Sequence, residues 1–315
     1  MSTSGTATFT RNRDQIIKSA LRKISAIESG ETPDSDTITE AAEALNTMVK
    51  HWQAAGAHIW RTQEAILFPQ VSQASYVLSS TSTDHATTSY VETALTVAAA
   101  DGASTITVGS VTGIATTYKI GVQVDDGTLH WTTVNGAPAG SVVTLTAPLD
   151  DSAAIGNRVL VYQTGLVRPL KILSARSFNF DSTIETPLDE MDRIEYQEMP
   201  NKAASSTVNG FYYDRRGGAT NSGLIYLWPT PANVDDAIKM TVARPIEDFS
   251  TAANDPDLPV EWIRALEWGL ADELADEYDV PEPKRTRIER RAAQYLADVN
   301  WWEKEITSIE FVPDR

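Results

Sequence analysis

The C-terminal part of the chain holds two amphipathic segments whose apolar faces need partners elsewhere in the sequence. They lie between Asp257 and Glu305, and Pro281 and Pro283 separate them, ending one helix and beginning the next. Their apolar residues recur at steps of three and four: Trp262, Leu266, Leu270 and Leu274 in the first segment, and Ile288, Ala292, Tyr295, Val299 and Trp302 in the second. This period places each set on one helical face, so the sequence predicts a helical hairpin with an apolar face to cover.

The partners of this hairpin are predicted at the opposite end of the chain. Residues 11–29 form a first helical pattern with Gly30 as its expected C′ residue, and a capping-box spacing from Thr37 to Glu40 opens a second pattern that ends at Gly56. The apolar faces consist of Ile17, Ala20, Leu21, Ile24 and Ile27 in the first helix and of Ile38, Ala41, Leu45, Met48, Val49 and Trp52 in the second. Because none of the four faces is covered locally, the sequence favours a small helical bundle made from both chain ends.

The residues between the two helical regions have a β pattern. Within residues 91–165, short segments rich in Val, Ile and Thr recur at a spacing of about ten residues. Turn signals separate them, at Asp101-Gly102, Asp126-Gly127, Asn135-Gly136 and Gly156-Asn157. We therefore expect residues 91–165 to form an independent antiparallel β module, a small barrel or sandwich, carried on the surface.

A second β layer is expected over residues 166–247. Strands are predicted at residues 171–175, 193–196, 211–213, 224–228 and 238–243. The predicted fold class is therefore α+β, with a helical bundle formed by both chain ends and a large inserted antiparallel β region. In domain terms, the prediction is a disordered arm at 1–10, bundle segments at 11–66 and 251–304, a β insert at 67–250 and a C-terminal extension at 305–315.

Charge and composition exclude several classes of protein. The formal net charge is −17, which is unfavourable for holding nucleic acid through its phosphates. The chain has no cysteine, so disulfides and thiolate metal sites are excluded. It has no apolar run of about 18 residues, so no membrane span and no membrane partner are predicted.

Motifs of catalysis are missing from the sequence. His51, His58, His85 and His130 stand apart and form no metal-binding pair such as HExxH. The sequence also has no nucleophile elbow, Walker loop or glycine-rich dinucleotide motif. We therefore predict no catalytic residue, no metal and no cofactor. Carboxylates that face each other across a cleft, as in a glycosidase, cannot be recognised from sequence, so a hydrolase stays an alternative.

Two charged segments of the helical hairpin are candidate interface sites. The acidic ridge consists of Asp272, Glu273, Asp276 and Glu277, and the basic ridge consists of Lys284, Arg287 and Arg291. Each ridge lies at the end of its helix where its sign opposes the helix dipole, so stability of the single helix does not explain it. Either the ridges neutralise each other, within the hairpin or between subunits, or they are solvated faces.

Several short segments follow one another in a fixed order along the chain. They are Trp52-Gln53-Ala54-Ala55-Gly56, Arg168-Pro169-Leu170-Lys171-Ile172, Arg193-Ile194-Glu195-Tyr196, Met199-Pro200-Asn201-Lys202, Gly210-Phe211-Tyr212-Tyr213-Asp214, Leu227-Trp228-Pro229-Thr230-Pro231, Arg244-Pro245-Ile246-Glu247-Asp248-Phe249, Leu258-Pro259-Val260-Glu261-Trp262 and Leu270-Ala271-Asp272-Glu273-Leu274-Ala275-Asp276-Glu277-Tyr278. In this order they resemble the head-to-tail adaptor, or connector, proteins of short-tailed bacteriophages. The resemblance covers nearly the whole chain except residues 91–165, which form an inserted β module.

The resemblance implies a structural protein of the virion neck, assembled in the host cytoplasm, and not an enzyme. Such a protein forms a homo-oligomeric ring, expected to have twelve copies, that docks on the portal protein and extends the DNA channel. It receives the tail through a tail nozzle or tail tube protein, with tail fibres as further candidates, and DNA passes through its lumen without specific binding. The ridges are then candidate subunit or portal contacts, and so are Phe311 and Arg315 in the C-terminal extension.

Two other functions remain open from the sequence. One is a virion-associated cell-wall hydrolase that uses a pair of carboxylates. The other is a glycan-binding adhesin that uses the 91–165 module, with Trp131 as an exposed stacking platform for a sugar ring.

Overall fold

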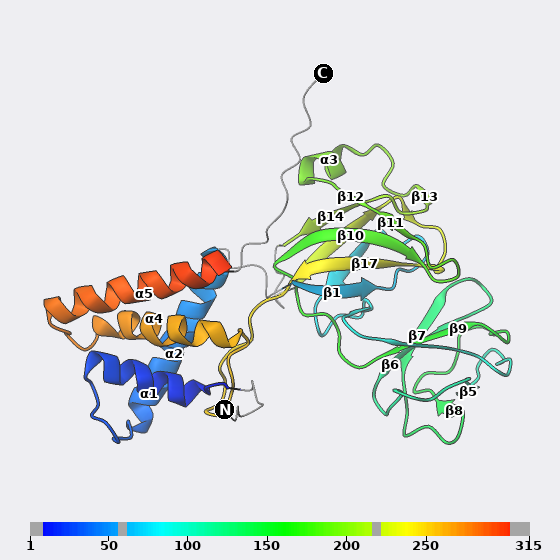
Figure 1. The fold of residues 1–315 in the computed structure, drawn as a ribbon. Coiled ribbons are helices and arrows are strands. Elements are labelled where there is room, and N and C mark those ends of the chain that lie inside the picture. The colour runs from blue at the N-terminus through cyan, green and yellow to red at the C-terminus, as the bar shows by residue number, and fades with distance from the viewer. Residues whose placement is uncertain (1–8, 56–61, 216–221, 303–315) are drawn as a thin grey trace, which may run out of the picture. The chain divides into compact units, whose positions relative to one another are not determined.

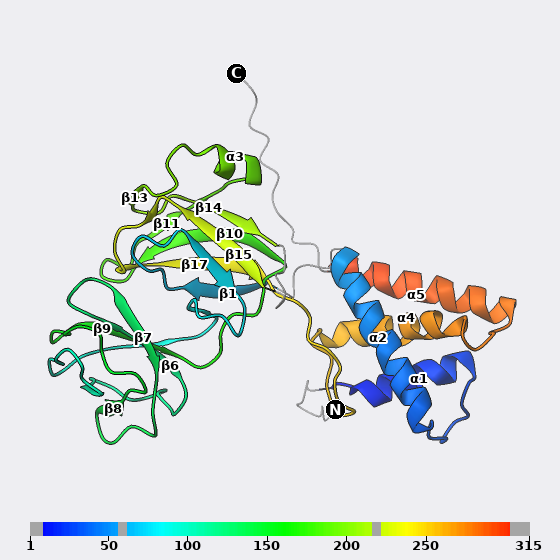
Figure 2. The same cartoon turned by 180° about the vertical axis from the view of Figure 1, so that it is seen from behind.

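The computed structural model describes residues 9–55, 62–215 and 222–302 of the chain. In this part of the chain the fold is mixed α+β, with five α-helices and several mostly antiparallel sheets (Figures 1 and 2). Two compact units divide the chain. Residues 1–61 and 245–315 form the first, here the helical unit, and Thr62–Arg244 form the second, here the β unit.

Helices from both chain ends share one core in the helical unit. Its elements are α1 (Arg13–Ile24), α2 (Ser35–Ala55), a 3-10 turn (Val260–Trp262), α4 (Ile263–Ala275) and α5 (Glu282–Trp302). α4 contacts α1, α2 and α5 and lies between α1 and α5 in both views (Figures 1 and 2). Leu21 of α1, Leu45 of α2 and Leu270 of α4 are fully buried in the same cluster. Buried residues of α1, α2 and α4 thus contribute to one core.

The end of α1 and the start of α2 differ from the prediction. α1 ends at Ile24, where Ser25 adopts a left-handed conformation (φ 63°), and it does not continue to Gly30. The amide of Ala26 donates to the carbonyl of Leu21 at 3.0 Å, which closes the helix end. α2 begins at Ser35 because the carboxylate of Asp34 accepts the Thr37 amide at 2.7 Å. An acidic side chain upstream therefore caps this helix, and the predicted box at residues 37–40 does not.

α2 and α4 approach each other closely at Gly269. A Cβ atom at this position would lie 2.7 Å from the ring of Trp52 and 2.8 Å from the sulfur of Met48. These two α2 side chains therefore occupy the space that any larger residue at 269 would need. A glycine inside a helix is otherwise unfavourable, so its place here is explained by packing.

Two sheets with a common core form the main body of the β unit. Their strand orders are β11-β10-β17-β1-β3 and β12-β14-β15-β2. The strands are β1 (Thr62–Leu67), β2 (Ser75–Leu78), β3 (Ala86–Thr87), β10 (Lys171–Asn179), β11 (Glu185–Pro187), β12 (Asp189–Glu190), β14 (Gly210–Asp214), β15 (Gly223–Trp228) and β17 (Asp236–Ala243), with a parallel pair β13 (Ser205–Ser206) and β16 (Thr230–Pro231) beside them. Leu67, Ile225 and Met240 are fully buried in the core that the two sheets share.

The first and last strands of the β unit are neighbours. β1 pairs antiparallel with β17, and Thr62 lies opposite Ala243. The two points where the chain enters and leaves this unit are therefore side by side. An insertion whose ends are adjacent can be placed within another domain with little disturbance, and this pairing meets that condition.

Residues 193–196 are helical, which corrects the strand predicted there. They belong to α3 (Arg193–Glu198). The Asp192 carboxylate accepts the Glu195 amide at 2.8 Å, and the Glu195 carboxylate accepts the Asp192 amide at 3.4 Å. This reciprocal capping box begins a helix, and the short alternating apolar pattern was too weak a signal against it.

The residues from 91 to 165 form two small sheets and not a closed barrel. The strands are β4 (Val91–Ala94), β5 (Thr105–Thr107), β6 (Lys119–Gln123), β7 (Leu129–Thr133), β8 (Val142–Thr144) and β9 (Arg158–Tyr162), in the orders β4-β9-β6-β7 and β5-β8. Asp126-Gly127 joins β6 to β7 with Gly127 at φ 86°, as the turn signal predicted. Ile106, Val122 and Val143 lie in the separate core of this module.

An aromatic cluster joins this module to the larger sheet. Phe68, which follows β1, and Phe180, which follows β10, share a buried cluster with Leu160 and Tyr162 of β9. Arg158 of β9 adds a polar connection, because its guanidinium contacts Asp181 at 2.7 Å and lies 4.4 Å from the ring centroid of Phe180. The module thus has its own core and a second core in common with its neighbour. Its independence as a domain stays a prediction.

Candidate assembly interface

The acidic ridge is divided between a helix end and a turn. α4 ends at Ala275, so Asp272 and Glu273 are helical whereas Asp276 and Glu277 lie in the turn that follows. Glu273, Asp276 and Glu277 are exposed and Asp272 is half-buried. The continuous helical ridge expected from the spacing is therefore shorter than predicted, and its last two carboxylates project from a turn.

Like charges meet where α4 lies against α5. Burial raises the pKa of Asp272, and the carboxylates of Glu289 and Glu273 raise it further. Glu289 belongs to α5, so the neighbouring helix presents a second carboxylate to Asp272 at this point. Arg285, also of α5, acts in the opposite direction without outweighing them, so the pKa of Asp272 stays raised.

The basic ridge is also divided. Lys284 donates to the hydroxyl of Ser25 at 2.5 Å, which ties the start of α5 to the end of α1. Arg287 is exposed, and Arg291 lies over the ring of Trp268 at 5.1 Å. Within the hairpin, Asp276 forms an ion pair with Arg285 at 2.5 Å. Arg285 was not part of the predicted basic ridge. Phe311 and Arg315 lie outside the described residues.

A buried carboxylate on α4 forms a charged site that the sequence did not predict. Glu267 is only 7% exposed and forms ion pairs with Arg11 and Lys23, the latter at 2.7 Å. Burial lowers the pKa of Lys23, and its hydrogen bond to Glu267 acts in the opposite direction. Because a buried charge is costly unless it is paired, these contacts fix Arg11 and α1 against α4.

A pocket of about 450 Å³ opens beside this carboxylate, and we name it the Glu267 pocket. Phe9, Arg11 and Lys23 line it from the N-terminal segment, and residues of the stretch from Val260 to Trp268 complete it. The ring of Trp268 lies 5.3 Å from the Lys23 ammonium and 6.3 Å from the ring of Tyr295. The pocket thus combines aromatic surface with positive charge.

The signal for this site in the sequence was weak. Glu267 lies between Leu266 and Trp268, where a carboxylate interrupts the apolar face of the helix. Its two cationic partners are more than 240 positions away, as the separations of 256 and 244 residues record. Only the packing of α1 on α4 identifies them.

A second groove, of about 380 Å³, lies on the β unit. Glu64, Arg176, Glu185 and Lys239 line it together with Tyr90. The carboxylates there are neutralised by cations: Glu64 by Arg176 at 2.8 Å, and Glu185 by Lys239 at 2.7 Å. The Lys239 hydrogen bond lowers the pKa of Glu185. A glycosidase needs one carboxyl group with a raised pKa, and Glu185 has the opposite shift.

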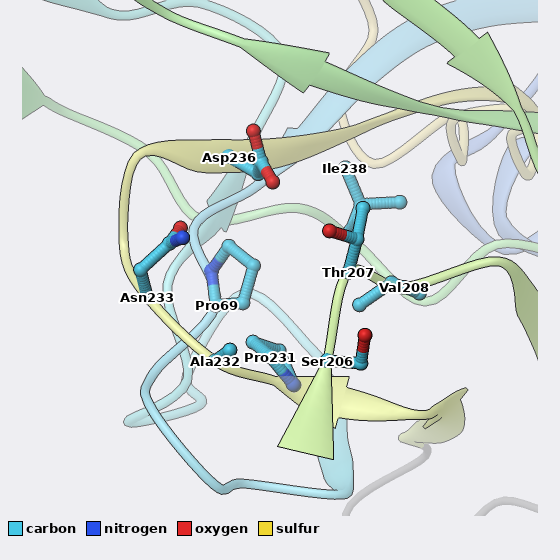
Figure 3. Close-up of a pocket in the computed structure, with 9 residues that line it drawn as sticks. All are labelled: Pro69, Ser206, Thr207, Val208, Pro231, Ala232, Asn233, Asp236 and Ile238. Carbon is cyan, nitrogen blue, oxygen red and sulfur yellow. The ribbon is translucent and has the colours of Figure 1, made fainter.

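A third pocket is too small for a ligand. Figure 3 shows it between Pro69, Val208, Pro231 and Ile238, with the Asp236 carboxylate at one side. Its volume is about 10 Å³, which is the space of about one water molecule. It therefore offers no room for a substrate.

Trp131 is not an exposed platform, which corrects the expectation for a glycan site. One face of its indole stacks on His85, with ring centroids 3.8 Å apart. Gly121 lies opposite Trp131 on β6, and a Cβ atom there would lie 2.8 Å from three atoms of the indole. The ring is half-buried between these two neighbours, so a sugar cannot stack on it without a rearrangement.

Metal sites and membrane-spanning helices were also considered in the sequence. Within residues 9–55, 62–215 and 222–302, no group of three His, Cys, Asp or Glu side chains is arranged to hold a metal ion. None of the helices in this described part of the chain combines the length and the apolar character that crossing a lipid bilayer requires.

Comparisons with known proteins add no relative. No model of a known protein family matches the chain, and a search of curated proteins also gives no match.

Proposed function

We propose that the chain is a head-to-tail adaptor of a short-tailed bacteriophage, a structural virion protein that forms a ring on the portal and receives the tail. The observation that carries the proposal is the arrangement of the chain: helices from both ends share a core, and the β unit is inserted between them. This arrangement agrees with the ordered segments that resemble the adaptor family, from Trp52-Gln53-Ala54-Ala55-Gly56 to Leu258-Pro259-Val260-Glu261-Trp262.

In this proposal the helical unit is the bundle that forms the ring wall. A wall element must keep its shape because the same contact is repeated at every subunit boundary. The fully buried leucines of α1, α2 and α4 and the close approach at Gly269 support that role. The β unit, which closes on itself through β1 and β17, is then available for contacts with the tail.

The net charge supports passage of DNA through the ring. Lumen surfaces that carry negative charge repel phosphates, whereas a lining of cations would hold the genome in place. With 43 acidic and 26 basic residues, the chain has the balance that passage without specific binding requires.

Contacts between neighbouring subunits are assigned in this proposal to the exposed charges of the ridges. Glu273 and Glu277 on the acidic side and Arg287 on the basic side are exposed. Asp276 contributes less between subunits because it pairs with Arg285 of its own chain. One exposed pair contributes about 0–1 kcal/mol, but a ring repeats it once per subunit.

A charge-reversal experiment on the portal tests this assignment. The variant Arg287→Glu should assemble on the portal at least about tenfold more weakly at low salt, because each boundary gains a repulsion that salt then screens. Combining it with Glu273→Lys and Glu277→Lys should restore assembly. Arg193→Glu, a reversal at an exposed arginine of the β unit, is the matched control. Sedimentation at low and high salt measures the bound copies, and equal assembly of Arg287→Glu and wild type at both salts would reject the assignment.

A further inference from the structure

The Glu267 pocket has exposed apolar side chains in its wall. Phe9 is 66% exposed and Val260 is 43% exposed, and both line the same pocket together with Ile263 and Trp268. A volume of about 450 Å³ lies within the range of about 300–1,000 Å³ that ligand pockets occupy. The pocket therefore has room for the side chains of a short peptide.

The charge of the pocket selects an acidic occupant. Its lining includes the cations Arg11, Lys23 and Arg264 against the carboxylates Glu261 and Glu267, which is a positive balance in a chain of net charge −17. Glu267 already binds Arg11 and Lys23. Arg264 is exposed, and it donates a hydrogen bond to the hydroxyl of Tyr295 at 3.3 Å, a neutral partner that leaves the guanidinium charge uncompensated by that contact. A carboxylate that enters the pocket would meet this guanidinium.

The segment that follows α5 has the matching composition. Residues 303–315 contain four carboxylates, Glu303, Glu305, Glu310 and Asp314, and four large apolar residues, Ile306, Ile309, Phe311 and Val312. An acidic segment with one aromatic residue complements a wall of cations and aromatic rings, because carboxylates pair with guanidinium groups and aromatic rings pack on Trp.

The segment starts close to the pocket. Tyr295 of α5 contacts two residues of the lining, Arg264 through its hydroxyl and Trp268 through its ring. Trp302, the last residue of α5, is seven residues further on, which is about 10 Å along a helix. Thirteen extended residues reach at most about 45 Å, so the segment can turn back to the pocket of its own molecule.

We infer that residues 306–314 bind in the Glu267 pocket of the same chain, with Phe311 against the apolar wall and an acidic side chain beside Arg264. The segment is covalently linked to α5, and such a short linker gives it an effective concentration at the pocket on the order of millimolar. Weak contacts are therefore sufficient for binding. The inference concerns the isolated chain, so it holds or fails without regard to a portal.

Disulfide trapping in the full-length chain tests the inference. The chain has no cysteine, so the pair Val260→Cys with Val312→Cys can be introduced without background. The control pair is Ala297→Cys with Val312→Cys: Ala297 is exposed on α5 and is nearer in sequence to residue 312. We expect the Val260 pair to form an intramolecular disulfide at least about tenfold faster than the control pair under mild oxidation. Adding Arg264→Glu should slow it by about fivefold, and Arg290→Glu, at an exposed arginine of α5, should leave it unchanged.

Three results would overturn the inference. Equal rates for the two cysteine pairs would mean that the segment samples its surroundings without binding. A disulfide that forms only between molecules, with a rate that rises with concentration, would assign the pocket to a second copy of the chain. A trapping rate that Arg264→Glu leaves unchanged would remove the charge complementarity on which the choice of occupant rests.

Discussion

The helical unit is built from two segments far apart in sequence, whereas the β unit is built from one continuous segment. The helical unit joins residues that are some two hundred positions apart: Lys50 donates to the carbonyl of Ile246, and Asn46 bonds to the backbone of Phe249. We expect that neither half of this unit covers its apolar face without the other. In the β unit, by contrast, β1 and β17 pair and close the region within its own sequence.

This difference favours the β unit as the inserted domain and the helical unit as the domain that it interrupts. A region whose ends are adjacent and whose strands pair internally can fold as an insertion. A region whose helices come from both ends of the chain cannot complete its core until the helices that follow the insertion are present. Damage at the C-terminal end should therefore destroy the helical unit and leave the β unit folded.

The largest expected effect comes from removing the last helices. A chain truncated at about residue 250 loses α4, with Leu266, Leu270 and Leu274 buried to within 1%. Each such side chain contributes roughly 1.5–3 kcal/mol, so we expect α1 and α2 of this fragment to be molten and to lose their cooperative melt, while its β unit stays folded. Circular dichroism during heating measures the loss.

The fragment of residues 62–244 tests whether the β unit folds without the helical unit. It should show one cooperative transition and the circular dichroism of a β protein. A native-like helical melt from the truncated chain, or an unfolded 62–244 fragment, would contradict the comparison.

A smaller effect is expected from Gly269→Ala in the helical unit. Alanine is the better helix former by about 1 kcal/mol, but its Cβ would lie 2.7 Å from the ring of Trp52. Overpacking costs typically 1–3 kcal/mol, so after the gain in helix propensity we expect a net loss of up to roughly 2 kcal/mol in the free energy of unfolding. Chemical denaturation measures it, and adding Trp52→Phe should recover part of the loss. An unchanged or raised stability would show that α2 and α4 are not tightly packed.

The smallest expected effect is a pH dependence confined to the β unit. Burial lowers the pKa of His85 from 6.5 to about 3. The unfolded chain therefore takes up the proton first, and stability is lost as the pH falls from about 6.5 towards 3. The contribution of this group should fall by about 1 kcal/mol between pH 7 and pH 5.5.

Two substitutions isolate this contribution. Replacing His85→Gln should flatten the pH profile of unfolding, because the titrating ring is gone. His51→Gln, at an exposed position of α2, is the control and should give a profile parallel to wild type. Parallel profiles for all three proteins would mean that His85 is not held neutral in the folded state.

Local signals predicted the elements where one residue type decides the geometry. Asp126-Gly127 predicted the hairpin between β6 and β7 because glycine takes up the positive φ there at no steric cost. The same reasoning failed at Thr37, because the carboxylate of Asp34 accepts the Thr37 amide and the helix begins upstream of the predicted cap. It also failed at Arg193, where a four-residue alternation cannot be distinguished from a helical turn.

The candidate sites were harder to predict from the sequence, because the packing of helices decides which charged side chains form ion pairs. Spacing along one helix placed Asp276 in a ridge, but its partner Arg285 follows from the way the chain turns after α4. Glu267 was missed because its partners Arg11 and Lys23 come from the other end of the chain. Trp131 was expected to be exposed, but His85 covers one face of its ring. His85 lies far from Trp131 in sequence, so the residues around Trp131 give no information about this contact.

The mass of the complex with the portal protein from the same genome tests the proposed function most directly. Native mass spectrometry of the portal alone and with excess chain gives the number of bound copies. The proposal predicts a single new species heavier by about 410 kDa, which is twelve copies of the 34.4 kDa chain. A portal whose mass does not change in the presence of excess chain would contradict the proposal.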